Sequence, residues 1–244
     1  MCLWRIKKVG KIFSDDGKEL LRILENLING FEINGEFPSV KRSIKQFDFD
    51  DVYTDILDYH EHIIDRRDEY DNYIFKNVLS GNEIIDRYKA EDSLRYKWNK
   101  NLESGRRLFE VCNDPWAIRI ITNITEDDLK GEIDNIICLA NELKYKIDVV
   151  NFYENPKLDG YRGVHLYFKN NKKCYPIEVQ FWTRRDWFLQ RYTHEVIYKQ
   201  SYEKSAIDYS NNLRDWVDNI PLSPLGLDSF IDYYYEVINS INYD

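Results

Sequence analysis

The sequence has little cysteine, and no part of it is continuously apolar. Its four cysteines are scattered without C-x-x-C spacing, so neither a zinc site nor a disulfide framework is predicted. Charges interrupt even the richest apolar segments, and none approaches the ~20 apolar residues that a membrane helix needs. The basic start, MCLWRIKKVGKIF, also lacks the apolar run of a signal peptide. We therefore expect a soluble, cytoplasmic protein with free thiols and no membrane partner.

Positive charge is also in short supply. The chain carries 43 acidic and 34 basic side chains, which gives a formal net charge of −9. A broad nucleic-acid-binding surface needs the opposite sign, because it must neutralise phosphates. Basic residues nevertheless gather at residues 95–107, 169–173 and 184–199. The composition therefore leaves room for a local anion site.

The apolar pattern predicts a mostly helical first third and then an α/β region. Residues 20–27 and 52–64 each form an amphipathic stripe, and residues 82–90 are expected to form a short helix or turn. Strands are predicted at residues 117–122, 146–153, 164–168 and 176–182, and further helices at 127–143, 185–199, 206–218 and 227–241. This order predicts a mixed sheet with helices packed on it.

This pattern divides the chain into three expected parts. Residues 1–90 are expected to form a helical N-terminal extension, residues 91–200 the central domain, and residues 201–244 a helical C-terminal extension. The cluster Tyr233, Tyr234 and Tyr235 in the last part is interpreted as packing a helix onto the domain.

Two acidic residues stand at the edges of predicted strands. Asp114 comes just before the segment AIRIIT, and Glu178 lies within PIEVQF. If these strands are neighbours, the two carboxylates can hold Mg²⁺, which prefers oxygen ligands and keeps substrate phosphates as further partners. Arg95, Lys97, Lys100, Arg106 and Arg107 supply cations close to Asp114 in sequence, as phosphoryl transfer requires. Each feature taken singly is more often part of a solvated charged surface.

The segment NPKLDGYRGVHLYF, residues 155–168, is more specific. Tyr161 follows a glycine at the head of a predicted strand, with Lys157, Arg162 and His165 around it. A tyrosine in this position can stack on a purine base while the cations reach its phosphates. A histidine on an apolar strand is otherwise more often a structural residue.

Five segments, in the same order, resemble the synthetase domain of the RelA/SpoT alarmone enzymes. They are RYK at 95–97, NDPWAIRII at 113–121, NPKLDGYRGVH at 155–165, IEVQFWT at 177–183 and HEVIYK at 194–199. The resemblance implies an α/β fold like that of nucleotidyltransferases, with a mixed sheet of about five strands, flanking helices and helical extensions at both ends. Residues 91–200 would then be the pyrophosphokinase domain.

The resemblance also implies roles for residues on the donor side. Arg95 and Lys97 match the pair that grips the phosphates of ATP. Asp114 matches the magnesium-binding aspartate, and Arg119 matches the arginine of the strand that follows it.

On the acceptor side, Tyr161 matches the tyrosine that stacks on the acceptor base, and Lys157 and His165 lie near the acceptor's phosphates. Glu178 matches the glutamate that helps to position magnesium and draws the proton from the attacking 3′-hydroxyl, and Gln180 follows it.

The implied reaction is in-line attack of a 3′-oxygen on the β-phosphorus of ATP, with release of AMP. The expected acceptor is GDP or GTP, as in GTP diphosphokinases, and the product is guanosine tetra- or pentaphosphate. Hydrolysis is not expected, since the His-Asp pair of the hydrolase domain found in bifunctional relatives is missing from the sequence. Three residues depart from the usual pattern: Trp182 replaces an arginine, Asp159 an asparagine and Gly163 a serine.

Two alternatives stay open. The resemblance also permits a member of the toxic branch of small synthetases, which modify adenine nucleotides or the 3′ end of tRNA and are neutralised by an antitoxin. The arginine lost at Trp182 permits a catalytically inactive, nucleotide-binding regulatory module. Some relatives are homo-oligomers that assemble through terminal helices.

Overall fold

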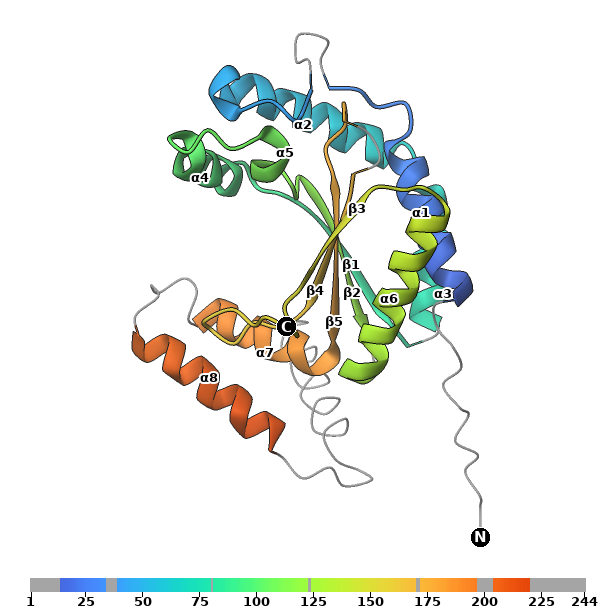
Figure 1. The fold of residues 1–244 in the computed structure, drawn as a ribbon. Coiled ribbons are helices and arrows are strands. Elements are labelled where there is room, and N and C mark those ends of the chain that lie inside the picture. Colours follow the sequence, from blue (N-terminus) through green and yellow to red (C-terminus); the bar gives the residue numbers. More distant parts are fainter. Residues whose placement is uncertain are drawn as a thin grey trace, which may run out of the picture.

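A computed structural model describes residues 14–33, 39–79, 81–122, 124–169, 172–196 and 204–219. Within them, a mixed five-stranded sheet is flanked by helices (Figure 1), so the predicted α/β class is confirmed. The strands are β1 (Glu83–Tyr88), β2 (Trp116–Thr122), β3 (Ile147–Asn151), β4 (Val164–Phe168) and β5 (Ile177–Thr183). Their order in the sheet is β1-β2-β5-β4-β3, in which β2 and β5 are parallel and the other neighbours are antiparallel.

Helices cover both faces of this sheet. They are α1 (Ser14–Ile28), α2 (Phe49–Ile64), α3 (Asp68–Leu79), α4 (Glu91–Leu102), α5 (Leu108–Val111), α6 (Glu126–Glu142), α7 (Arg184–Val196) and α8 (Lys204–Asp218), with a 3₁₀ turn η1 (Ile44–Gln46). Figure 1 shows α1, α3 and α6 on one side of the sheet and α4, α5, α7 and α8 on the other. Every helix among the described residues is too short or too polar to cross a lipid bilayer.

Local sequence explains where the long helices begin and how they pack. The Asp48 carboxylate accepts a hydrogen bond from the Asp50 backbone N–H at 2.8 Å and caps α2. The Thr125 hydroxyl does the same for α6, whose first turn is acidic and so complements the helix dipole. Gly17 lets α1 approach α6 closely, since a Cβ there would lie 3.1 Å from Ile136 Cγ1. The predicted helix at 227–241, which contains the three tyrosines, lies outside the described residues.

Residues 82–90 are a correction to the expected short helix or turn. Residues 83–88 form β1, which pairs with β2 from Glu83↔Ile121 to Tyr88↔Trp116. The pairing continues one residue further, because the Lys89 backbone N–H donates to the Pro115 carbonyl at 2.9 Å. A half-buried edge strand tolerates charged side chains, and these hid its β character. The strand precedes the domain boundary expected at residue 91; the boundaries themselves stay a prediction.

The two faces of the sheet have different chemistry. Ile118 and Ile120 of β2 belong to the large core that includes the apolar residues of α1 and α6. The intervening residue Arg119 lies on the other face, opposite Gln180 of β5. Because side chains alternate along a strand, this second face collects Arg119, Glu178 and Gln180.

Candidate active site

Asp114 and Glu178 come from different segments and meet at one end of the parallel strands. Asp114 lies two residues before β2, and Glu178 of β5 is in register with Ala117 of β2. Both carboxylates are buried, at 6% and 3% exposure. Nη2 of Arg87 lies 3.3 Å from Asp114 Oδ2 and 3.6 Å from Glu178 Oε2. The structure therefore brings together the two acids that the sequence singled out.

Three cations surround the Asp114 carboxylate. Besides Arg87, Nζ of Lys89 lies 2.6 Å from Oδ2 and Nζ of Lys97 lies 3.2 Å from Oδ1. Lys97 also donates to the Asn113 side-chain oxygen. Burial would raise the pKa of Asp114, but the charges of Lys97, Lys89 and Arg87 together outweigh it and lower the pKa to about 2. Asp114 is thus ionised at neutral pH. The three cations carry more positive charge than this one carboxylate neutralises, so they can also attract a further anion.

Arg87 and Lys89 were missed in the sequence. The tripeptide Arg-Tyr-Lys occurs twice, at 87–89 and at 95–97, and only the second copy was singled out. The repeated tripeptide is the signal that could have found them.

The second copy delivers only one of its two cations. Lys97 reaches Asp114, but the Arg95 guanidinium group lies 2.7 Å from Asp50 and 2.8 Å from Glu91 and covers the Phe49 ring at 4.2 Å. The structure therefore does not bring Arg95 to Asp114 or Glu178. Lys100 lies exposed on α4.

A hydrogen-bonded row fixes Glu178. His165 Nδ1 donates to Glu178 Oε1 at 2.9 Å, and Gln180 Nε2 donates to Oε2 at 2.7 Å. Arg119 Nε in turn donates to the Gln180 side-chain oxygen at 3.1 Å. Burial would raise the pKa of Glu178, yet the hydrogen bond and charge of His165 and the charge of Arg87 lower it. The carboxylate is therefore ionised, with both oxygens held in place.

Arg119 adds positive charge beside this row. Burial and the nearby charge of Arg87 lower the pKa of Arg119 to about 10. Arg87 and Arg119 therefore repel each other, and the Glu178 carboxylate offsets part of this repulsion. The face above Glu178 is thus suited to a phosphate-rich ligand.

Tyr161 is buried, so the expected stacking surface is not open in this structure. Its ring is 6% exposed and makes edge contacts with Phe152 and Trp182. The Lys157 ammonium lies 4.3 Å from the ring centre and covers one face. The hydroxyl of Tyr161 is hydrogen-bonded to Nε2 of His165, and Nδ1 of the same ring faces Glu178. Tyr161 therefore belongs to the row that orients Glu178.

The departures Trp182 and Gly163 explain each other. Trp182 Nε1 donates to the Tyr161 hydroxyl at 3.1 Å, and its indole ring lies directly on Gly163. A Cβ at residue 163 would come within 2.1 Å of Trp182 Nε1, and the φ of +149° there also disfavours any side chain. Trp182 further stacks on Trp187, with ring centres 5.1 Å apart. The indole and the glycine thus form one matched pair in the wall of the site.

The loop at 155–163 is held from two sides. Asp159 Oδ1 accepts the Tyr161 backbone N–H at 3.1 Å, so this carboxylate shapes the turn. From α8, Ser210 donates to the Asp159 carbonyl at 2.7 Å and Asn211 to the Leu158 carbonyl at 3.1 Å. These contacts explain how an acidic residue replaces asparagine in this loop.

Arg162, predicted to bind the acceptor, is paired with carboxylates of two helices. Its guanidinium group lies 3.3 Å from Asp218 of α8 and 3.9 Å from Glu126 of α6. Arg185 contacts the same two acids, at 3.0 and 3.8 Å. In this arrangement, protein carboxylates occupy the positions in which an anionic ligand of Arg162 would lie.

The donor atoms of the carboxylate pair fit a magnesium ion. Among the described residues, His, Cys, Asp and Glu side chains form no cluster of three or more that would make an all-protein metal site. Mg²⁺ characteristically takes one or two carboxylates and completes its shell with water and substrate phosphates. Asp114 and Glu178 meet this requirement, since one arginine nitrogen contacts both.

Two buried carboxylates lie on one α/β sheet with lysine and arginine side chains around them. Residues 86–203, just under half of the chain, match the family described as "Region found in RelA / SpoT proteins". The chain thus contains a region similar to that found in RelA/SpoT proteins. No curated protein matches it.

Several solved structures show limited similarity. The small alarmone synthetase 1 from Bacillus subtilis bound to its product pppGpp is 16% identical, with 65% of this chain and 79% of that chain covered and a TM-score of 0.40. The small alarmone synthetase 2 of the same organism is 20% identical, with 65% and 80% covered and a TM-score of 0.40. A GTP pyrophosphokinase family protein from Streptococcus pneumoniae is 18% identical, with 66% and 76% covered and a TM-score of 0.39. Values this low assign no activity.

Proposed function

We propose that the chain is an ATP-dependent pyrophosphokinase, which moves the β,γ-pyrophosphate of ATP to the 3′-hydroxyl of a nucleotide. The observation that carries the proposal is the contact of one Arg87 nitrogen with both Asp114 and Glu178. It means that two acids and several cations converge where a metal-bound triphosphate would need both. The match of residues 86–203 to the region found in RelA/SpoT proteins supports the same reaction class.

The donor half of the site follows from the charges. Asp114 and Glu178 would hold Mg²⁺, which when bound would neutralise charge on the β- and γ-phosphates. Lys89 and Lys97, now paired with Asp114, would then be free to contact phosphate oxygens. Cations fixed in advance around the reacting phosphorus stabilise the transition state without reorganisation.

Glu178 is the residue best placed to take a proton. Its carboxylate is ionised, and His165 and Gln180 hold one oxygen each. As the acceptor's 3′-oxygen forms its bond to the β-phosphorus, the hydroxyl proton passes to Glu178. The bond between that phosphorus and the α–β bridging oxygen breaks, and AMP leaves.

For the acceptor we propose GDP or GTP, without any hydrolase activity. Lys157 covers the Tyr161 ring, so a base can stack there only after this side chain moves aside. Arg162 would exchange Asp218 and Glu126 for the acceptor's phosphates.

The test is transfer of label from γ-labelled ATP in the presence of magnesium. GDP, GTP, ADP and deacylated tRNA serve as separate acceptors, and AMP release is followed in parallel. Label on GDP or GTP is expected. Label on ADP or tRNA alone would replace the proposed acceptor with that of the toxic branch, and ATP binding without AMP release would indicate an inactive module. Asp114→Ala should lower transfer by about 10³-fold or more, and full transfer in this variant would overturn the metal assignment.

A further inference from the structure

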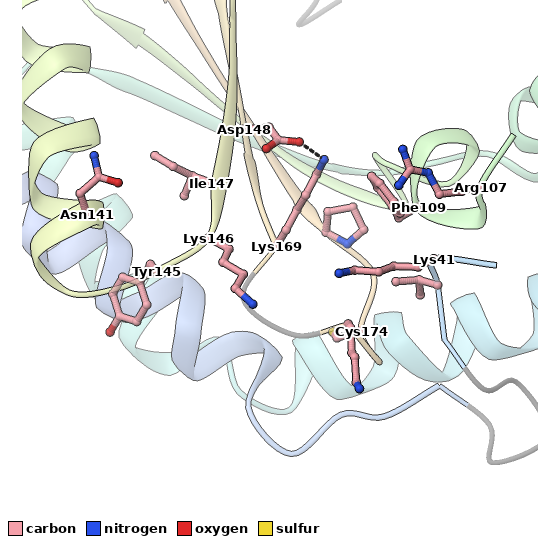
Figure 2. Close-up of a pocket in the computed structure, with 13 residues that line it drawn as sticks. Lys41, Arg107, Phe109, Asn141, Tyr145, Lys146, Ile147, Asp148, Lys169 and Cys174 are labelled. Carbon is pink, nitrogen blue, oxygen red and sulfur yellow. Dashed lines mark hydrogen bonds and ion pairs between the residues drawn. The ribbon is translucent and has the colours of Figure 1, made fainter. Parts of the chain in front are cut away.

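A cavity of about 380 Å³ opens where β3 begins and β4 ends (Figure 2). Its walls come from the segment before η1, from α5, from the α6–β3 connection and from the segment after β4. Neither Asp114 nor Glu178 lines it, and neither do the cations Arg87, Lys89 and Lys97. The cavity is therefore separate from the carboxylate pair. We call it the basic pocket.

Positive charge dominates the basic pocket. Five basic residues line it against the single acid Asp148; they are Lys41, Arg107, Lys146, Lys169 and Lys172. This reverses the balance of a chain whose net charge is −9. Lys169 pairs with Asp148, and Arg107 lies 2.9 Å from Glu110.

The other three basic residues differ from Lys169 and Arg107 in their pairing. Within the described part of the chain, Lys41, Lys146 and Lys172 form no ion pair. Figure 2 shows the side chains of Lys41 and Lys146 extending toward one another across the cavity. Like charges that face one another raise the free energy unless an anion lies between them. These exposed ammonium groups are therefore available to an anion in the cavity without the loss of an ion pair among the described residues.

The pocket also has an apolar wall. Phe109, Ile147 and Pro176 line it, and the Phe109 ring carries the Lys169 ammonium group at 4.5 Å and the Arg107 guanidinium group at 5.1 Å. Sites for small molecules typically combine apolar walls with a few charged groups in ~300–1,000 Å³. The basic pocket has this size and both components.

We propose that the basic pocket is a second binding site, which takes a small organic phosphate. Lys41, Lys146 and Lys172 would hold the phosphate groups, and the organic part would lie against Phe109 and Ile147. A charged head with an apolar body satisfies both halves of the wall, whereas free phosphate satisfies only one. The assignment does not depend on the proposed reaction, because the two sites share no residue.

Calorimetric titration of the full chain with ADP tests this proposal, with inorganic pyrophosphate as the second probe. The double variant Lys41→Glu/Lys146→Glu removes the pocket's charge, and Arg87→Ala weakens the carboxylate site. Lys18→Glu/Lys204→Glu is the matched control, since it changes two exposed lysines outside the pocket and alters the net charge equally. Unfolding curves verify that the variants fold.

The wild type and the control are expected to bind two molecules of ADP. The pocket variant should lose one of these sites, with affinity there reduced by about tenfold or more, while Arg87→Ala keeps it. ADP should bind the pocket more tightly than pyrophosphate. Two unchanged sites in the pocket variant, or tighter binding of pyrophosphate than of ADP, would overturn the proposal. If the wild type instead bound a single ADP, at a site that the pocket variant loses and Arg87→Ala keeps, the result would count against the proposed function and not against the pocket.

Discussion

The two Arg-Tyr-Lys tripeptides have the same sequence, but their side chains contact different partners. Residues 87–89 run along the end of strand β1, where side chains two apart point the same way, so Arg87 and Lys89 both reach Asp114. Residues 95–97 lie in helix α4, where side chains two apart diverge by about 200°. Lys97 reaches Asp114 there, while Arg95 turns to Asp50 and Glu91.

The middle tyrosines differ in the same way. Tyr88 packs edge-on against His60, with ring centres 4.7 Å apart, whereas Tyr96 is 68% exposed. The first copy is thus anchored through all three of its side chains, and the second through Arg95 and Lys97. Secondary structure, rather than residue identity, decides how many side chains of each copy contact Asp114 and Glu178.

The largest expected difference lies between the two arginines. Arg87→Ala should reduce pyrophosphate transfer by about 10²–10³-fold, since it removes the group that contacts both carboxylates. Arg95→Ala should stay within about threefold of the wild type, because its partners are exposed acids. Steady-state rates with saturating ATP measure both. If Arg95→Ala lost as much as Arg87→Ala, the second copy would be the phosphate-binding one.

The two lysines should differ less. Lys89→Ala and Lys97→Ala each remove one cation from Asp114, so we expect each to lower the transfer rate by about 10–100-fold. Lys100→Ala, from the exposed side of α4, serves as the control and should change the rate little. A large loss in Lys100→Ala with an intact Lys97→Ala would mean that α4 turns a different face to the substrate.

The sequence was sufficient for elements that carry a clear period. The strands β2 to β5 and the helices α1, α2, α6, α7 and α8 follow the spacing of their apolar residues. These residues alone are enough to predict which face of each element packs against the rest of the protein. Strand β1 could not be predicted because its partner, β2, supplies the pairing, while three of its own six side chains are charged and its inner residues are only half-buried. Helix α4 was missed for a related reason, since only Leu94 and Trp98 in it are buried.

The candidate site shows the same limit. Asp114 and Glu178 could be paired in advance because two neighbouring strands fix their separation. The burial of Tyr161 could not be predicted, because it depends on contacts of its side chain with Trp182 and Lys157. These contacts form only when the chain folds. The sequence motifs therefore predicted the positions of Asp114 and Glu178 better than they predicted the exposure of Tyr161.

A smaller effect is expected on stability. Tyr88→Ala should lower the free energy of unfolding by about 1 kcal/mol, since the ring loses its contact with His60. Tyr96→Ala should change it by less than about 0.5 kcal/mol, because the side chain is largely exposed. Urea unfolding at neutral pH measures both. Equal losses would show that the second copy is anchored as firmly as the first.

The smallest effect is a pH dependence from His60. Its Nε2–H donates to the Pro115 carbonyl at 2.9 Å, and burial lowers its pKa from 6.5 although this hydrogen bond opposes the shift. The unfolded chain therefore binds a proton that the folded chain does not, so stability is full above pH 6.5 and falls as the pH drops below it. Between about pH 7.5 and pH 5.5, the wild type should lose more stability than His60→Gln. Parallel losses in the two proteins would contradict this assignment.

The most direct test of the account is the rate of pyrophosphate transfer by Glu178→Gln, which keeps the shape of the side chain and removes its charge. The account predicts a loss of about 10³-fold or more, with an unfolding curve close to that of the wild type. Transfer at the wild-type rate by a folded Glu178→Gln protein would contradict the claim that Asp114 and Glu178 form one metal-bound phosphate site.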